Sequence, residues 1–125
     1  MLDPASKNTL FIGTGTGFAP LYYQIRAQSV RENPPKMHFA FGVRSEIDAF
    51  YHEEIMSTGV SFTQYYSAPA GEAGEKGYVT AYLTPENISG YEQFSICGSP
   101  AMVKSAREIL EAAGVAKDAV KFEQY

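Results

Sequence analysis

The sequence predicts an α/β fold of the doubly wound class, a parallel sheet of about five strands with helices on both faces. Two observations predict it. Short apolar runs rich in β-forming residues alternate with segments of helical periodicity along the 125 residues, and a glycine-rich turn follows the first of these runs directly. Alternation of this kind indicates parallel strands joined by crossover helices. Because such crossovers are right-handed, any ligand is expected outside the carboxyl ends of the strands.

Each expected strand is a short run bounded by turn-forming residues. The five runs span residues 9–12, 37–43, 60–66, 94–97 and 120–125. Residues 70–77 are rich in Gly and Glu and are expected to form a flexible loop. The fourth and fifth strands should be adjacent and parallel, so their carboxyl ends should meet on the edge where the glycine-rich turn opens.

Helical periodicity fills the segments between the strands. The first helix begins at Phe18, carries Pro20 near its first turn and ends before the two prolines at positions 34 and 35. The residues on its one apolar face are Leu21, Tyr22, Ile25 and Ser29. The second helix begins at Ser45, whose neighbourhood has capping-box spacing. Its inward residues are expected to be Ile47, Phe50, Tyr51 and Ile55.

Two further helices are expected around the fourth strand. A short one covers residues 78–84. The last has Ser99 as its N-cap and Pro100 at its first helical position. Gly114 fits the position just past its end. The apolar face of this last helix consists of Met102, Ala106, Ile109 and Ala113.

Length and charge restrict the classes of partner. The chain is expected to be one domain, residues 1–125, with a single core. Its net charge of −4 and its singly scattered basic residues argue against a nucleic-acid or acidic-membrane surface, which needs clustered Lys and Arg. No apolar run approaches the roughly 20 residues of a membrane-spanning helix. The one cysteine, Cys97, excludes an internal disulfide, and the cytoplasm is the default compartment.

The turn after the first strand is the clearest candidate for a ligand-binding element. Residues 13–20 read GTGTGFAP. Glycines let backbone amides approach an anion with no Cβ in the way, and the N-terminus of the following helix adds a favourable dipole. The spacing G-x-G-x-G differs from the G-x-G-x-x-G of two-domain dehydrogenases, and no Gly-Lys-Ser/Thr of a P-loop follows. A tight strand-to-helix turn that binds no ligand is the alternative.

With this turn, the chain resembles the pyridine-nucleotide domain of the ferredoxin–NADP reductase family. Four stretches match the family's pattern in order: GTGTGFAP, FGVRSEIDAFY, ICGSPAMV and the terminal FEQY. Together they span almost the whole chain, and Cys-Gly-x-Pro is the most specific match. Members of the family join a flavin-binding barrel to this domain. They pass a hydride between NAD(P)H and FAD or FMN, and electrons then go on to a protein or a small acceptor.

The resemblance implies a role for each matched residue. The cofactor-binding loop would consist of Gly13, Thr14, Gly15, Thr16 and Gly17, its last four residues lining the pyrophosphate and Pro20 setting the loop. The residues beside the nicotinamide would be Cys97, Gly98, Ser99 and Pro100, with Met102 supporting their turn. Arg44 and Ser45 would lie at the adenine-side ribose. Glu123 would be an active-site carboxylate and Tyr125 the terminal ring that covers the flavin, so that Cys97, Glu123 and Tyr125 would form the catalytic group.

More ordinary interpretations of some of these residues stay open. Cys97 at a strand end is also typical of a small buried thiol, and Arg44 of a solvated residue at a strand exit. No partner set supports a nucleophilic cysteine, since His38 falls within an expected strand and His52 within an expected helix. No Cys/His spacing supports a metal centre.

The flavin-barrel motif of the family, an Arg-x-Tyr-Ser/Thr strand, is absent from the chain, and residues 1–6 look like the connection between two halves. We therefore expect the NAD(P)H-binding part of a longer flavin oxidoreductase, which is inactive alone, although a flavin-binding domain in a separate chain would also fit. FAD or FMN would belong to the intact protein only, and the electron acceptor is not identified. The rival function is a non-catalytic nucleotide-sensing module. A receiver-like signalling domain would need an acidic cluster at the strand ends, whereas the exit of the first strand here is all Gly and Thr.

The choice between NADH and NADPH depends on the charge near the adenosine ribose. A 2′-phosphate calls for Arg or Lys at that position. Arg44 is the only basic residue just after the second strand, and Glu46 and Asp48 follow it closely. The exit of the third strand has no basic residue. These observations favour NADH over NADPH.

Overall fold

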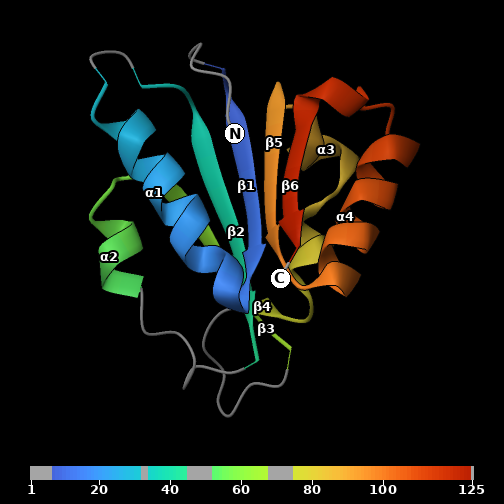
Figure 1. Ribbon diagram of the computed structural model, residues 1–125, viewed down its shortest axis with the longest axis horizontal. Coiled ribbons are helices and arrows are strands. Elements are labelled where there is room, and N and C mark those ends of the chain that lie inside the picture. Colours follow the sequence, from blue (N-terminus) through green and yellow to red (C-terminus); the bar gives the residue numbers. More distant parts are fainter. Residues whose placement is uncertain (1–6, 32–33, 45–51, 68–74, 125) are drawn as a thin grey trace.

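The strands form one fully parallel sheet in the order β4-β3-β2-β1-β5-β6 (Figure 1). The computed structural model describes residues 7–31, 34–44, 52–67 and 75–124. The strands are β1 (Thr9–Thr14), β2 (Met37–Val43), β3 (Ser61–Tyr66), β4 (Glu75–Lys76), β5 (Gln93–Gly98) and β6 (Val120–Gln124). All five expected strands are present, so the doubly wound parallel fold is confirmed.

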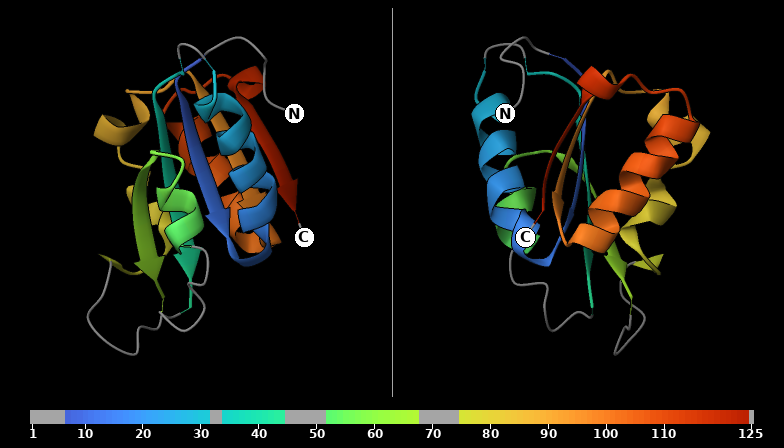
Figure 2. Two further views of the ribbon diagram at one scale, coloured as in Figure 1. Left: turned by 90° about the vertical axis from the view of Figure 1, so that its left-hand side faces the viewer. Right: turned by 45° about the vertical axis from the view of Figure 1, so that its right-hand side comes forward.

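Helices cover both faces of the sheet, as the alternation predicts. Figure 2 shows α1 (Phe18–Ser29) and α2 (His52–Met56) on one face, and α3 (Pro85–Ile88) and α4 (Pro100–Ala112) on the other. Three short 3-10 segments complete the described part of the chain: η1 (Gly15–Gly17), η3 (Val79–Tyr82) and η4 (Lys117–Ala119). None of the helices in the described ranges has the length and apolar character needed to cross a membrane.

Alternation along the strands divides the core into two clusters, one under each helical layer. The cluster under α1 and α2 contains Phe11, Phe18, Leu21, Ile25, Phe39, Phe41, Ile55, Val60 and Cys97. The cluster under η3, α3 and α4 contains Leu10, Ile12, Ala40, Tyr65, Val79, Leu83, Ile88, Phe94, Ile96, Met102, Val103, Ala106 and Leu110. The central strands β1 and β5 are buried on both faces, which is typical of a parallel sheet covered on both sides.

Both ends of α4 have the chemistry that the sequence predicts. The Ser99 side chain accepts a hydrogen bond from the Met102 backbone N–H at 3.4 Å, and Pro100 takes the first helical position, where its missing N–H costs nothing. Gly114, just past the other end, has a φ of 88°, a conformation that residues with a Cβ rarely adopt. Local sequence therefore fixes where this helix begins and ends.

Two expectations between β3 and β5 are wrong. Part of the loop expected at 70–77 forms the short edge strand β4, held by a hydrogen bond from the Gly77 backbone N–H to the Tyr66 carbonyl at 2.9 Å. The expected helix at 78–84 is instead the 3-10 segment η3, and α3 begins only at Pro85. Thr84 is extended because a following proline disfavours helical backbone angles. The helix expected from Ser45 is seen as α2 only, since residues 45–51 lie outside the described residues.

Candidate functional site

The order of the strands places a topological switch point between β1 and β5. The chain runs from β1 through β2 and β3 to one edge of the sheet, then returns to place β5 and β6 on the other side of β1. Crevices at such switch points, outside the carboxyl ends of the strands, bind ligands in open α/β sheets. Two segments meet there: the glycine turn (residues 13–17) after β1, and the β5–α4 turn (residues 97–100). Gly13 and Cys97 are register partners at the ends of these strands.

Gly17 allows the two turns to touch. A Cβ added to Gly17 would collide with the Cys97 carbonyl oxygen and lie 3.0 Å from the Gly98 backbone nitrogen. The backbone of Gly17 itself is in the ordinary right-handed helical region, so the need for glycine here is one of space. By contrast, Gly15 has open space around its Cβ position but a φ of 46°, so its glycine is needed for backbone conformation.

A hydrogen bond also joins the two turns. The backbone N–H of Ser99 donates to the Thr14 side-chain hydroxyl at 3.3 Å. Gly98 lies between Thr14 and Met102, because a Cβ on Gly98 would collide with the Thr14 hydroxyl and lie 3.0 Å from the Met102 methyl group. Met102 therefore lies beside this turn, and the supporting role that the resemblance implies stays a prediction.

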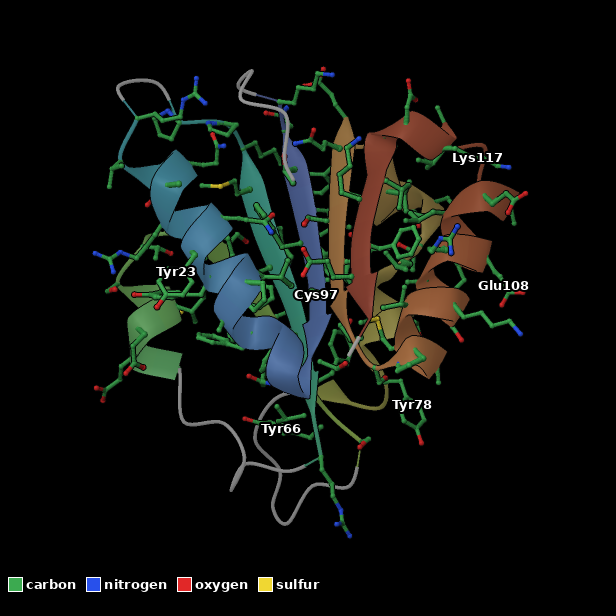
Figure 3. The ribbon with its side chains drawn as sticks, in the orientation of Figure 1. Tyr23, Tyr66, Tyr78, Cys97, Glu108 and Lys117 are labelled. Carbon is green, nitrogen blue, oxygen red and sulfur yellow. The ribbon has the colours of Figure 1, made fainter. Side chains whose placement is uncertain are left out.

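The structure brings Cys97 and Glu123 together and buries the first of them. They are register partners on the parallel strands β5 and β6, which confirms the predicted juxtaposition at one edge. Cys97, labelled in Figure 3, is 2% exposed. It belongs to the buried cluster under α1 that also contains Phe18. Glu123 is exposed. Contact of the thiol with a nucleotide stays a prediction. Tyr125 lies outside the described residues.

The other implied ligand residues are distributed along the same edge. Arg44 directly follows β2 and is exposed, whereas Ser45 lies outside the described residues. Pro20 is the third residue of α1 and is half-buried. The backbone of Thr16 belongs to η1, and its side chain is not among those that the structure describes. Figure 3 shows Tyr66 and Tyr78 at this edge. Tyr66 is buried, whereas Tyr78 is 74% exposed.

Backbone groups dominate the described part of this site. The glycine turn leads into the N-terminus of α1, and the β5–α4 turn leads into the N-terminus of α4 (Figure 1). Both N-termini present amide N–H groups and the positive end of a helix dipole. Such an arrangement suits an extended anionic ligand such as a diphosphate.

Sequence reasoning missed one polar cluster, which lies away from the switch point. The ring nitrogens of His38 hydrogen-bond to the Ser61 hydroxyl at 2.7 Å and the Thr63 hydroxyl at 2.9 Å. Its ring stacks on Tyr82 with centroids 4.5 Å apart. Burial, with a smaller contribution from the charge of Lys36, lowers the pKa of His38 to about 4. The available signal in the sequence was His38 in one expected strand together with Ser61 and Thr63 at alternate positions of the next strand.

The comparisons with known proteins agree with this geometry. Residues 11–108 match the model of the oxidoreductase NAD-binding domain family. The chain belongs to this family. The resemblance to the nucleotide domain of ferredoxin reductases is thereby confirmed.

Individual relatives are reductase components. The chain is 34% identical to the reductase component of propane 2-monooxygenase from Rhodococcus jostii over 128 residues, which is 93% of this chain and 35% of that protein. It is 31% identical over 116 residues to the ferredoxin–NAD(P)(+) reductase component of the naphthalene 1,2-dioxygenase/salicylate 5-hydroxylase systems from a Ralstonia species, covering 85% of this chain and 34% of that protein. The chain therefore spans well under half the length of these relatives.

A solved structure shares the fold. The ferredoxin reductase in carbazole 1,9a-dioxygenase superposes with a TM-score of 0.84 at 22% identity, covering 98% of this chain and 39% of that chain. This likeness extends over nearly all of the parallel sheet and its helices.

Proposed function

We propose that this chain binds NADH or NADPH across the carboxyl edge between β1 and β5, as the nucleotide-binding part of a flavin-dependent oxidoreductase. The observation that carries the proposal is the contact of Gly17 with the Cys97 carbonyl, which joins the glycine turn to the β5–α4 turn. Backbone amides of the glycine turn would hold the diphosphate, and the β5–α4 turn would lie beside the nicotinamide.

In this proposal the chain binds and orients the nucleotide. A flavin carried by another domain would supply the ring that accepts the hydride. Phe18 and Cys97, 5% and 2% exposed, belong to the same buried apolar cluster and would help to keep water from the nicotinamide. Glu123, opposite Cys97 on β6, would be the active-site carboxylate, and Tyr125 would cover the flavin.

The proposed acceptor is a protein. The relatives named above are reductase components of oxygenase systems, one of them a ferredoxin reductase component. We therefore extend to this chain, as a proposal, onward electron transfer to an oxygenase or ferredoxin component. The alternative of a non-catalytic nucleotide-sensing module is not favoured, because these relatives are enzymes of electron transfer.

Titration of the purified chain with NADH, followed by calorimetry, tests the nucleotide site directly. Saturable binding of one NADH per chain is expected. The same preparation should show no flavin absorbance and no NAD(P)H oxidase activity, because the described residues build only the nucleotide-binding sheet. Absence of nucleotide binding would refute the proposed site. Stoichiometric FAD or FMN in the purified chain would refute the proposal that the flavin is carried by another domain.

We further propose a preference for NADH. Arg44 is exposed at the exit of β2, but a single solvated cation gives little selectivity for a 2′-phosphate without a second basic group beside it. NADH should therefore bind at least as tightly as NADPH, and Arg44→Ala should leave the ratio of the two affinities nearly unchanged. A clear NADPH preference that disappears in Arg44→Ala would show that Arg44 recognises the phosphate.

A further inference from the structure

We propose that Thr14 is a positioning residue, whose hydroxyl holds the β5–α4 turn in the orientation that the nicotinamide half of the ligand needs. The inference rests on the proposed function and deepens it. Its starting point is the 3.3 Å hydrogen bond from the Ser99 backbone N–H to the Thr14 hydroxyl. Ser99 is also the N-cap of α4. One side chain at the end of β1 is thus linked to the first turn of a helix whose sequence begins 86 positions later.

Both arms of the Thr14 side chain have a defined neighbour. The hydroxyl lies against Gly98, where an added Cβ would collide with it. The methyl group lies on the side of Gly42 in β2, 3.4 Å from the position that a Cβ would take there. Glycine at both places leaves room for the branched side chain. Branching at Cβ restricts χ1, and a defined neighbour for each arm restricts it further, so the hydroxyl is directed at the β5–α4 turn.

The hydrogen bond is placed to affect geometry more than stability. Thr14 is half-buried and Ser99 is exposed, so water can replace the hydroxyl at the Ser99 amide when the hydroxyl is removed. The glycine turn, proposed to hold the diphosphate, keeps its own contact through Gly17 and the Cys97 carbonyl. Loss of the hydroxyl should therefore loosen the β5–α4 turn and leave the diphosphate site in place.

Two conservative variants separate the two arms of Thr14. Thr14→Val keeps the branched shape and the methyl packing but removes the acceptor, whereas Thr14→Ser keeps the acceptor and removes the methyl group. Each is titrated calorimetrically with NADH and with ADP-ribose, which carries the adenosine and the diphosphate but no nicotinamide. In Thr14→Val the affinity for NADH should fall about threefold to tenfold, the range of one neutral hydrogen bond, and this loss should exceed any loss of affinity for ADP-ribose. Thr14→Ser should restore the ratio of the two affinities.

A matched control removes the same kind of hydrogen bond elsewhere. Thr84 caps α3 by accepting the Asn87 backbone N–H at 3.3 Å, toward the opposite end of the sheet (Figure 1). Thr84→Val should lower the melting temperature and leave both affinities unchanged. Equal weakening of NADH and ADP-ribose in Thr14→Val, an unchanged NADH affinity, or the same loss in Thr14→Ser would each overturn the positioning role. If neither ligand binds the wild-type chain, the proposed function itself fails, which is a separate result.

Discussion

Gly17→Ala is the most direct test of the contact between the glycine turn and the β5–α4 turn. The added methyl group would occupy the space of the Cys97 carbonyl oxygen and lie 3.0 Å from the Gly98 nitrogen. Both obstructing groups are backbone, so no change of side-chain rotamer can relieve the clash. The glycine turn and the β5–α4 turn must therefore separate. The site at the switch point is expected to open.

The size of the effect follows from the nature of the contact. Inserting a methyl group into a well-packed site costs about 1–3 kcal/mol, and rigid surroundings place Gly17→Ala near the upper end. For a domain of this size that corresponds to a melting temperature lower by about 12 °C, at about 4 °C per kcal/mol. Displacement of the amides from a charged diphosphate should weaken NADH binding about tenfold to a hundredfold.

Thermal unfolding and calorimetric titration measure the two effects, and Gly114→Ala is the control. Gly114 has a φ of 88° and no atom within 4 Å of an added Cβ, so the substitution strains the backbone at the end of α4 without a clash. It should cost about 1–2 kcal/mol and leave NADH affinity unchanged. Wild-type affinity in Gly17→Ala would refute the reasoning, because the turns would then not need to touch. Equal losses of affinity in both variants would instead indicate a general response to lower stability.

Three further predictions address stability and the catalytic group. Burial lowers the pKa of His38 from 6.5 to about 4. As the pH falls, the His38 ring is therefore protonated in the unfolded chain before it is protonated in the folded chain. The free energy of unfolding should be unaffected by His38 above pH 6.5 and should fall by about 1.4 kcal/mol per pH unit, about 3 kcal/mol in all, towards pH 4. Denaturant unfolding across this range should show a shallower fall in His38→Gln; identical pH profiles would contradict a neutral buried ring. Ser99→Ala should cost about 1 kcal/mol through loss of the α4 cap, with unchanged thermal unfolding as the opposing result. In the protein joined to its flavin domain, Tyr125→Ala should alter nicotinamide affinity and hydride-transfer rate in stopped-flow measurements, whereas a frayed chain end would leave both untouched.

Features with a local cause were predictable from the sequence. The Ser99-Pro100 pair marks the start of α4 because capping and the missing proline N–H act within one turn of helix. The five longer strands were predictable because each is a short run rich in β-forming residues, bounded by turn-forming residues. Parallel pairing of β5 with β6 followed from the topology alone, and it brought Cys97 and Glu123 into register.

Features with a tertiary cause were not predictable. β4 has two residues, too few for any periodicity, and it exists because β3 offers an edge to pair with. The polar residues His38, Ser61 and Thr63 are visible in the sequence, but only the pairing register of β2 with β3 brings both hydroxyls to the ring nitrogens of His38. The break between η3 and α3 is a different case. The Thr84-Pro85 pair is a local signal for a break at this point, because a residue before proline disfavours helical backbone angles.

The burial of Cys97 limits how this residue can act on a nucleotide. Strand alternation directs Ser95 and Cys97 toward α1, where the Ser95 hydroxyl donates to Gln24 at 2.9 Å and the thiol packs with Phe18. The groups that the β5–α4 turn offers to a ligand at the switch point are therefore mainly backbone groups, held in place by Gly17 and Thr14. If that is their role, Cys97→Ala should change NADH affinity much less than Gly17→Ala does. A larger loss in Cys97→Ala would show that the thiol turns out of the core to meet the nicotinamide.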